Sequence, residues 1–320
     1  MSSPRYLPLL IVLPILLLLV PLTLGIQHWS QSEWIENYIF TRRQAYWRAH
    51  LDRCSLSGPY TTMTDRLILG DAFNPDFASK KVYLLGGCLM EEVLDTRALG
   101  RSRSEIGIYG MPGYNFVDLK ELVEWFIQDL AFGKHFDRTH LILVGITMDL
   151  TEPPVTPRPA DYFLASGLYD YDGGRIRLKP MSNQNRWFII HRKRMSEFLT
   201  SLWRLRPHMI AREIPEGLAP EMDTSQVAEQ LKALDGILQI LKGTGAKVEA
   251  VVTPNAKWLE TPGRIQVRNQ MIALCQKEGI QVQDLSKALA DRDFLDQDHM
   301  TFEGQQITNQ KLLPFMRPFL

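Results

Sequence analysis

The chain has 320 residues, 45% of them hydrophobic, which is enough to bury a large core in one large or two modest domains. Lysine plus arginine and aspartate plus glutamate both number 36, so the formal net charge is zero. Because there is no basic field and no nucleic-acid-binding motif, we expect no nucleic-acid partner.

The first predicted element is an apolar segment at 7–26. Its twenty residues carry no charge, and a helix of that length spans about the thickness of a bilayer core. A cleaved signal peptide, the alternative, usually has a shorter apolar core and a better cleavage site than the one at Thr23 and Gly25. We therefore expect 1–26 to be an uncleaved, single-pass transmembrane signal anchor. The charge bias across it is weak, and we expect the short tail inside and the main domain outside the cytoplasm.

The residues at 27–80 predict a connection between this anchor and a folded domain. Trp, Tyr, Ile and Arg are frequent in 29–53, as in a helix that leaves a bilayer with aromatic side chains at the interface. Turn-forming residues and weak periodicity then predict a loop at 55–79. We expect a juxtamembrane helix followed by a lead-in loop.

From residue 81 onward, predicted strands and helices alternate. Apolar runs predict strands at 81–85, 105–109, 140–146, 247–253 and 280–285. Helical spacing predicts helices near 89–97, 116–131, 225–242, 261–278 and from 301 toward 313. Apolar strands separated by helices indicate a parallel sheet covered on both faces. The predicted fold class is therefore α/β, with five parallel strands in a domain at 81–320.

An insertion at about 151–224 interrupts the alternation. It begins with four prolines at 151–159, and 168–177 predicts a turn-rich hairpin. Residues 185–212 hold seven Lys or Arg against one acid, interleaved with aromatic and aliphatic side chains, which predicts one or two basic amphipathic helices. Such helices either cover core residues with a solvated charged face or lie on anionic headgroups or a membrane partner. The sequence leaves both possibilities open.

Side chains suited to catalysis follow the predicted strands, and ligands bind at the carboxyl ends of strands in a parallel sheet. Cys88 follows the first strand, where the start of the next helix favours the thiolate. A small buried thiol is the alternative interpretation.

Asp296 and His299 follow the fifth strand. An aspartate three residues before a histidine can accept a hydrogen bond from one ring nitrogen while the other faces a nucleophile. The alternatives are that Asp296 caps the last helix and that His299 is structural. We expect no comparable setting for the other histidines, at 28, 50, 135, 140, 191 and 208.

At these residues the sequence resembles the SGNH, or GDSL-like, hydrolase superfamily. Residues 296–304 read Asp-x-Asp-His-x-Thr-x-x-Gly, like the block that supplies acid and base in that family, and 108–115 resemble the block after its second strand. The resemblance covers about 81–316 without the insertion. It implies a three-layer flavodoxin-like fold, a triad and an oxyanion hole. The triad is Cys88, His299 and Asp296, and the oxyanion hole uses the backbone N–H groups of Cys88 and Gly113.

The sequence departs from the family pattern at two positions. Cys88 stands where the family has serine, and Gly87 replaces the preceding aspartate. The block at 145–149 lacks the asparagine that serves as the family's side-chain oxyanion donor, and Thr147 or Met148 occupies its place. Loss of such a donor costs on the order of 3–4 kcal/mol of transition-state stabilisation. A thiolate is a stronger nucleophile than an alcohol, and we expect Thr147 to complete the oxyanion hole.

An anchored extracytoplasmic domain of this kind resembles the SGNH-like proteins that O-acylate cell-envelope polymers, as in teichoic acid D-alanylation and alginate acetylation. The resemblance implies an acyltransferase that works through a Cys88 thioester. A membrane-bound O-acyltransferase is its expected partner, and an envelope polysaccharide or lipid is the acceptor. Asp149 and Asn115 are expected to help bind substrate, and no metal or organic cofactor is implied. An esterase of envelope glycans or lipids and a catalytically silent binding scaffold remain as alternatives.

Overall fold

The structure is a computed structural model. It describes residues 80–87, 89–94, 105–110, 115–129, 132–148, 167–172, 175–186, 188–189, 192, 217–296 and 299–320. The chain divides into two compact units, 1–46 with 181–206, and 47–180 with 207–320. The predicted anchor at 1–26 and residues 27–79 of the predicted 27–80 connection lie outside the described residues. Within the described part, no helix is both long enough and apolar enough to cross a bilayer.

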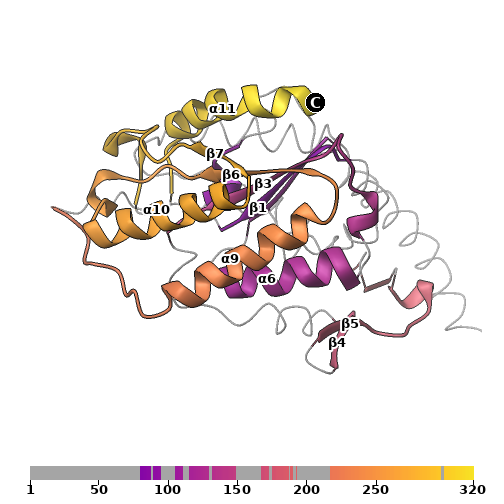
Figure 1. Ribbon diagram of the computed structural model, residues 1–320. Coiled ribbons are helices and arrows are strands. Elements are labelled where there is room, and N and C mark those ends of the chain that lie inside the picture. Colours follow the sequence, from indigo (N-terminus) through magenta and orange to yellow (C-terminus); the bar gives the residue numbers. More distant parts are fainter. Residues whose placement is uncertain are drawn as a thin grey trace, which may run out of the picture. The chain divides into compact units, whose positions relative to one another are not determined.

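Five parallel strands form the sheet of the second unit (Figure 1). They are β1 (Val82–Gly86), β2 (Ile106–Gly110), β3 (Leu141–Ile146), β6 (Lys247–Val252) and β7 (Gln281–Asp284). Their order is β2-β1-β3-β6-β7, and every neighbouring pair is parallel. Counted along the chain this is 2-1-3-4-5, a common order of doubly wound α/β sheets. The prediction of an α/β domain with five parallel strands is confirmed.

Helices cover both faces of this sheet (Figure 1). Helices α6 (Phe116–Glu124), α9 (Val227–Lys242) and α10 (Pro262–Lys277) pack in that order on one face. Helices α5 (Leu89–Glu92) and α11 (Phe302–Met316) pack on the other, where their apolar side chains share one core with the strands. Strand side chains alternate between the faces, so both faces of the apolar strands are buried.

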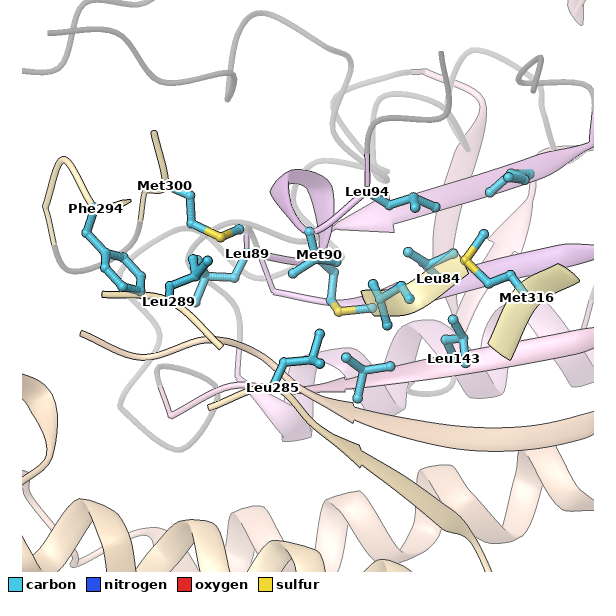
Figure 2. Packing of buried hydrophobic residues seen from close by; sticks show 14 of the residues in the cluster. Leu84, Leu89, Met90, Leu94, Leu143, Leu285, Leu289, Phe294, Met300 and Met316 are labelled. Atoms are coloured by element: carbon cyan, nitrogen blue, oxygen red, sulfur yellow. The ribbon is translucent and has the colours of Figure 1, made fainter. Parts of the chain in front are cut away.

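The core under α11 joins side chains of the strands, of α5 and α11, and of the loop before α11 (Figure 2). Leu84 of β1, Leu143 of β3, Met90 of α5 and Met316 of α11 are fully buried. Burial of one such side chain stabilises the fold by roughly 1.5–3 kcal/mol. The end of β1 and the neighbouring segment of β3 each carry a glycine, and a Cβ built on either would lie within 2.5 Å of the Met90 Cγ atom. The glycines therefore leave the space that Met90 fills.

One predicted helix differs in detail from the structure, and a predicted hairpin is confirmed. The helix predicted at 116–131 is an α-helix only to Glu124 and continues as a π-helix, Trp125–Asp129. Three successive residues, Trp125, Phe126 and Ile127, are all buried there, which an α-helix with a single buried stripe does not provide. The predicted hairpin is confirmed as antiparallel β4 (Tyr169–Asp172) and β5 (Arg175–Leu178). Its Tyr169 ring packs edge-on against Trp125 at 5.2 Å between centroids.

Candidate active site

The Asp–His pair lies on a closed loop between β7 and α11. Phe294 and Met300 form an isolated antiparallel bridge, and the Leu295 amide donates to the His299 carbonyl oxygen at 2.9 Å. Phe294 and Met300 are both buried in the core shown in Figure 2. The bridge closes the base of the loop, so Asp296 and His299 are held on a short connection between two anchored ends.

Asp296 and His299 contact each other as the spacing predicts. The His299 Nδ1 atom lies 2.8 Å from Oδ1 and 2.9 Å from Oδ2 of Asp296. Because the carboxylate accepts from Nδ1–H, the basic nitrogen of the neutral ring is Nε2. The side chains are 25% exposed for His299 and 24% for Asp296. The pair therefore has the geometry of a general base with its orienting carboxylate, and it is accessible to solvent.

The remaining residues of the 296–304 block hold this loop in place. Thr301 is the N-cap of α11, with its Oγ1 accepting from the Gly304 amide at 3.2 Å. The Thr301 amide donates to the Asp293 carbonyl oxygen at 2.8 Å. A Cβ on Gly304 would lie 2.7 Å from that same oxygen, so glycine lets the helix approach the loop closely. Thr301 rather than Asp296 caps the helix.

The segments around Cys88 and His299 meet in one apolar cluster. Leu89 follows Cys88 in the chain and Met300 follows His299, and both are buried in the cluster that also holds Leu289 (Figure 2). The Met90 amide donates to the Gly87 carbonyl oxygen at 3.0 Å, which turns the chain from β1 into α5. Sequence neighbours of the predicted nucleophile and base thus share a packing environment.

Three predicted site residues, Cys88, Gly113 and Asp149, lie outside the described residues. Their assigned roles in nucleophilic attack, oxyanion binding and substrate binding stay predictions.

Thr147 directly follows β3 and is 1% exposed. Its Oγ1 atom is buried and has no hydrogen-bond partner in the described part of the chain. A buried hydroxyl without a partner costs about 1–3 kcal/mol, so each such group calls for a reason. In the strand order 2-1-3-4-5, ligands bind at the carboxyl ends of the first and third strands, β1 and β3. Thr147 is therefore a candidate donor to a ligand at this place.

Asn115 has a structural role. It is the N-cap of α6, where its side-chain oxygen accepts from the Asp118 amide at 3.1 Å. The Asn115 amide donates in return to the Asp118 carboxylate at 3.5 Å, which completes a capping box. The predicted contact of Asn115 with substrate stays a prediction beside this capping role.

A second Asp–His pair shows that the expectation of a single such setting was wrong. His140 Nδ1 lies 2.8 Å from Asp137 Oδ1, at the same spacing in the chain and the same distance as the first pair. Nδ1 also lies 3.2 Å from the Asp137 amide nitrogen, but a ring nitrogen that donates to the carboxylate cannot accept as well. The His140 ring is buried against Phe136 and Tyr83. The signal was an Asp-x-x-His directly before an apolar strand.

The position in the fold distinguishes the two pairs. Asp137 and His140 precede β3 at the amino ends of the strands, whereas Asp296 and His299 follow β7 at the carboxyl ends. Ligands of parallel sheets bind at the carboxyl ends. The spacing alone therefore does not identify a catalytic pair.

Cys275, the one cysteine in the described part of the chain, is expected to be unreactive because its thiol is buried. Cys275 lies on α10, is fully buried, and burial raises the pKa of its thiol to about 12. Reagents that attack thiolates should not modify it in the folded protein. Among the described residues, no group of three or more His, Cys, Asp or Glu side chains could hold a metal ion.

No protein-family model matches the sequence, and no curated protein matches it either.

Proposed function

We propose that the sheet-containing unit is an SGNH-type acyl-transfer domain with the flavodoxin-like arrangement. Cys88 is its nucleophile, His299 its base and Asp296 the residue that orients the base. The segment 1–26 anchors it in the cell membrane, with the domain on the extracytoplasmic side. It transfers an acyl group to a cell-envelope polysaccharide or lipid together with a membrane-bound O-acyltransferase.

The observation that carries the proposal is the Asp296–His299 pair at the carboxyl ends of the strands. The 2.8 Å contact fixes the ring, and partial exposure leaves it accessible. The shared packing of Leu89 and Met300 supports a short path from the first strand end to this pair. The sequence block at 296–304 and the strand order both favour the same family.

In the proposed reaction, His299 Nε2 takes the proton from the Cys88 thiol as the sulfur attacks the carbonyl carbon of an acyl ester. The oxyanion accepts hydrogen bonds from the backbone N–H groups of Cys88 and Gly113 and from the Thr147 hydroxyl. The intermediate collapses to a thioester, and the leaving alcohol takes the proton from His299. An acceptor hydroxyl then gives its proton to His299 as its oxygen attacks the thioester, and the C–S bond breaks while His299 returns the proton to the Cys88 sulfur. Asp149 and Asn115 are proposed to help bind the substrate.

Cysteine-resolved alkylation of the full chain in detergent micelles tests the nucleophile and base. We expect iodoacetamide at pH 7 to modify Cys88 about tenfold faster in the native protein than in the His299→Asn variant, because a paired imidazolium stabilises the thiolate. His140→Asn makes the same change in the other Asp–His pair and should leave the Cys88 rate unchanged. Cys275 should stay unmodified in each variant, which reports that the domain is folded.

An activated acyl ester tests the chemistry in the same micelles. Acyl should accumulate on Cys88 as a hydroxylamine-sensitive thioester and be absent from Cys88→Ala. Transfer to an added polyol indicates a transferase, and release into water alone indicates the esterase alternative. Cys88 that reacts no faster than a free thiol, with no acylation, would establish the silent scaffold and refute the proposal.

A further inference from the structure

A helix in the first unit exposes an aromatic side chain. The first unit comprises 1–46 and 181–206, and within it residues 183–186, 188–189 and 192 are helical. Ser182 caps this helix, because its Oγ accepts from the Asn185 amide at 3.2 Å. The Arg186 amide donates to the Ser182 carbonyl oxygen at 3.1 Å and closes the first turn. The helix therefore starts at a defined position.

One face of this helix is exposed along its described length. Gln184, Phe188 and Arg192 follow one another at a spacing of four residues, so they share that face, and all three are exposed. The Phe188 side chain is 61% exposed. The described residues contain two other exposed large apolar side chains, Val117 and Leu218, and neither is aromatic. At a membrane surface, an exposed phenylalanine can insert at the headgroup level while an arginine one turn away pairs with lipid phosphates.

The charge of the segment favours an anionic partner. Within the first unit, residues 185–206 carry six Lys or Arg and one acid, although the whole chain is neutral. Basic residues with interleaved aromatic side chains bind anionic lipid headgroups through charge and insertion of the rings. The same compact unit contains the uncharged segment 7–26, the predicted transmembrane anchor. A headgroup surface would therefore lie near this unit.

We propose that the helical residues described above, 183–186, 188–189 and 192, lie on an anionic lipid surface, with Phe188 inserted at the headgroup level and Arg192 facing lipid phosphates. They would form a second membrane contact beside the anchor. This contact rests on the proposed anchor at 1–26, but it uses no residue of the proposed active site, so it can be tested separately from acyl transfer.

Amide hydrogen exchange of the reconstituted full chain tests this contact. The chain is placed in vesicles of phosphatidylcholine alone or of phosphatidylcholine mixed with phosphatidylglycerol, and exchange is followed in peptides from 182–192. We expect about tenfold slower exchange in the anionic vesicles, with the difference lost at high salt. Phe188→Ser with Arg192→Gln should abolish the difference.

A matched control changes an exposed apolar and an exposed basic residue in the other unit. Leu218→Ser with Lys287→Gln should leave the lipid-dependent protection of 182–192 intact. Equal exchange in the two kinds of vesicle would overturn the proposal. Equal protection in detergent micelles without lipid would also overturn it, because the chain itself would then cover this helix.

Discussion

At the scale of single residues, the position of Thr147 at the carboxyl end of β3 sets it apart, because other buried polar atoms, such as Trp258 Nε1 and Gln305 Oε1, also lack a partner among the described residues. The Thr147 side chain is buried at the end of the central strand β3, and its hydroxyl has no partner in the described part of the chain. A hydroxyl in that state lowers the stability of the folded protein. A side chain that donates to an oxyanion must be held in position before the substrate binds, and its hydroxyl then has no hydrogen-bond partner until the oxyanion forms.

Thr147→Val replaces the hydroxyl with a methyl group of similar size. We expect the free energy of unfolding to stay the same or to rise by up to about 1 kcal/mol, because no hydrogen bond is lost. We expect the rate of Cys88 acylation to fall by about a hundredfold, because an oxyanion donor is lost. Chemical denaturation and acyl-ester kinetics on the same preparation check both effects.

Thr147→Ser keeps the hydroxyl and is the control, so it should retain most of the activity. A Thr147→Val variant that is destabilised by more than 1 kcal/mol with unchanged acylation would assign the hydroxyl a structural role.

At the scale of elements, α11 is tied to the site by its first turn. Gly304 lies where the helix meets the loop, and its missing side chain allows contact with the Asp293 carbonyl oxygen. Gly236 lies within α9, where a Cβ would meet only the flexible end of the Lys120 side chain. The two helical glycines therefore differ in what surrounds them.

The two glycine-to-alanine changes should have opposite signs. Alanine ordinarily stabilises a helix by about 1 kcal/mol relative to glycine, and Gly236→Ala should follow this rule because Lys120 can move. Gly304→Ala should destabilise the protein by roughly 1–3 kcal/mol, because backbone atoms cannot give way as easily. Thermal and chemical unfolding measure both variants. Stabilisation by Gly304→Ala would show that the contact with Asp293 is not tight in solution.

The elements that the sequence predicted best are those with strong periodicity. The predicted strand bounds agree with the structure to within about a residue, because short apolar or alternating runs bounded by turns have few other structures. The Asp296–His299 contact was predictable because both residues lie on one short loop. The sequence did not predict the π-helix after α6, because its hydrogen-bond pattern depends on the tertiary contacts of residues such as Trp125. The sequence also could not show that the Thr147 hydroxyl lacks a partner, because hydrogen-bond partners in the core depend on how distant segments pack.

At the scale of the whole molecule, the sheet separates two Asp–His pairs that look alike locally. Asp296 and His299 lie on the loop that precedes α11, with both side chains partly exposed. Asp137 and His140 lie before β3, where the ring is packed and the carboxylate accepts several hydrogen bonds. We therefore expect Asp137 and His140 to stabilise the fold, and we expect protonation of Asp137 to lower the free energy of unfolding.

The pH dependence follows from the pKa of the Asp137 carboxyl. Hydrogen bonds from the Thr139 hydroxyl, then from its amide and from His140, lower this pKa from its ordinary 3.8 to about 2. A carboxyl with a lower pKa in the folded state stabilises the protein above its unfolded pKa and loses that effect as pH falls. The contribution should therefore be complete above pH 5 and disappear as the pH falls through about 4 to 2.

Asp137→Asn removes the titrating group and should remove this part of the acid sensitivity. The difference in unfolding free energy between native and variant protein should be constant at neutral pH and shrink toward zero as the pH falls to about 2. Thr139→Val removes the largest cause of the shift but keeps the carboxyl, so it should produce an intermediate slope. Denaturant titrations at stepped pH, read by tryptophan fluorescence, measure both. A difference that does not change with pH would mean that Asp137 acts through its hydrogen bonds alone and not through its charge.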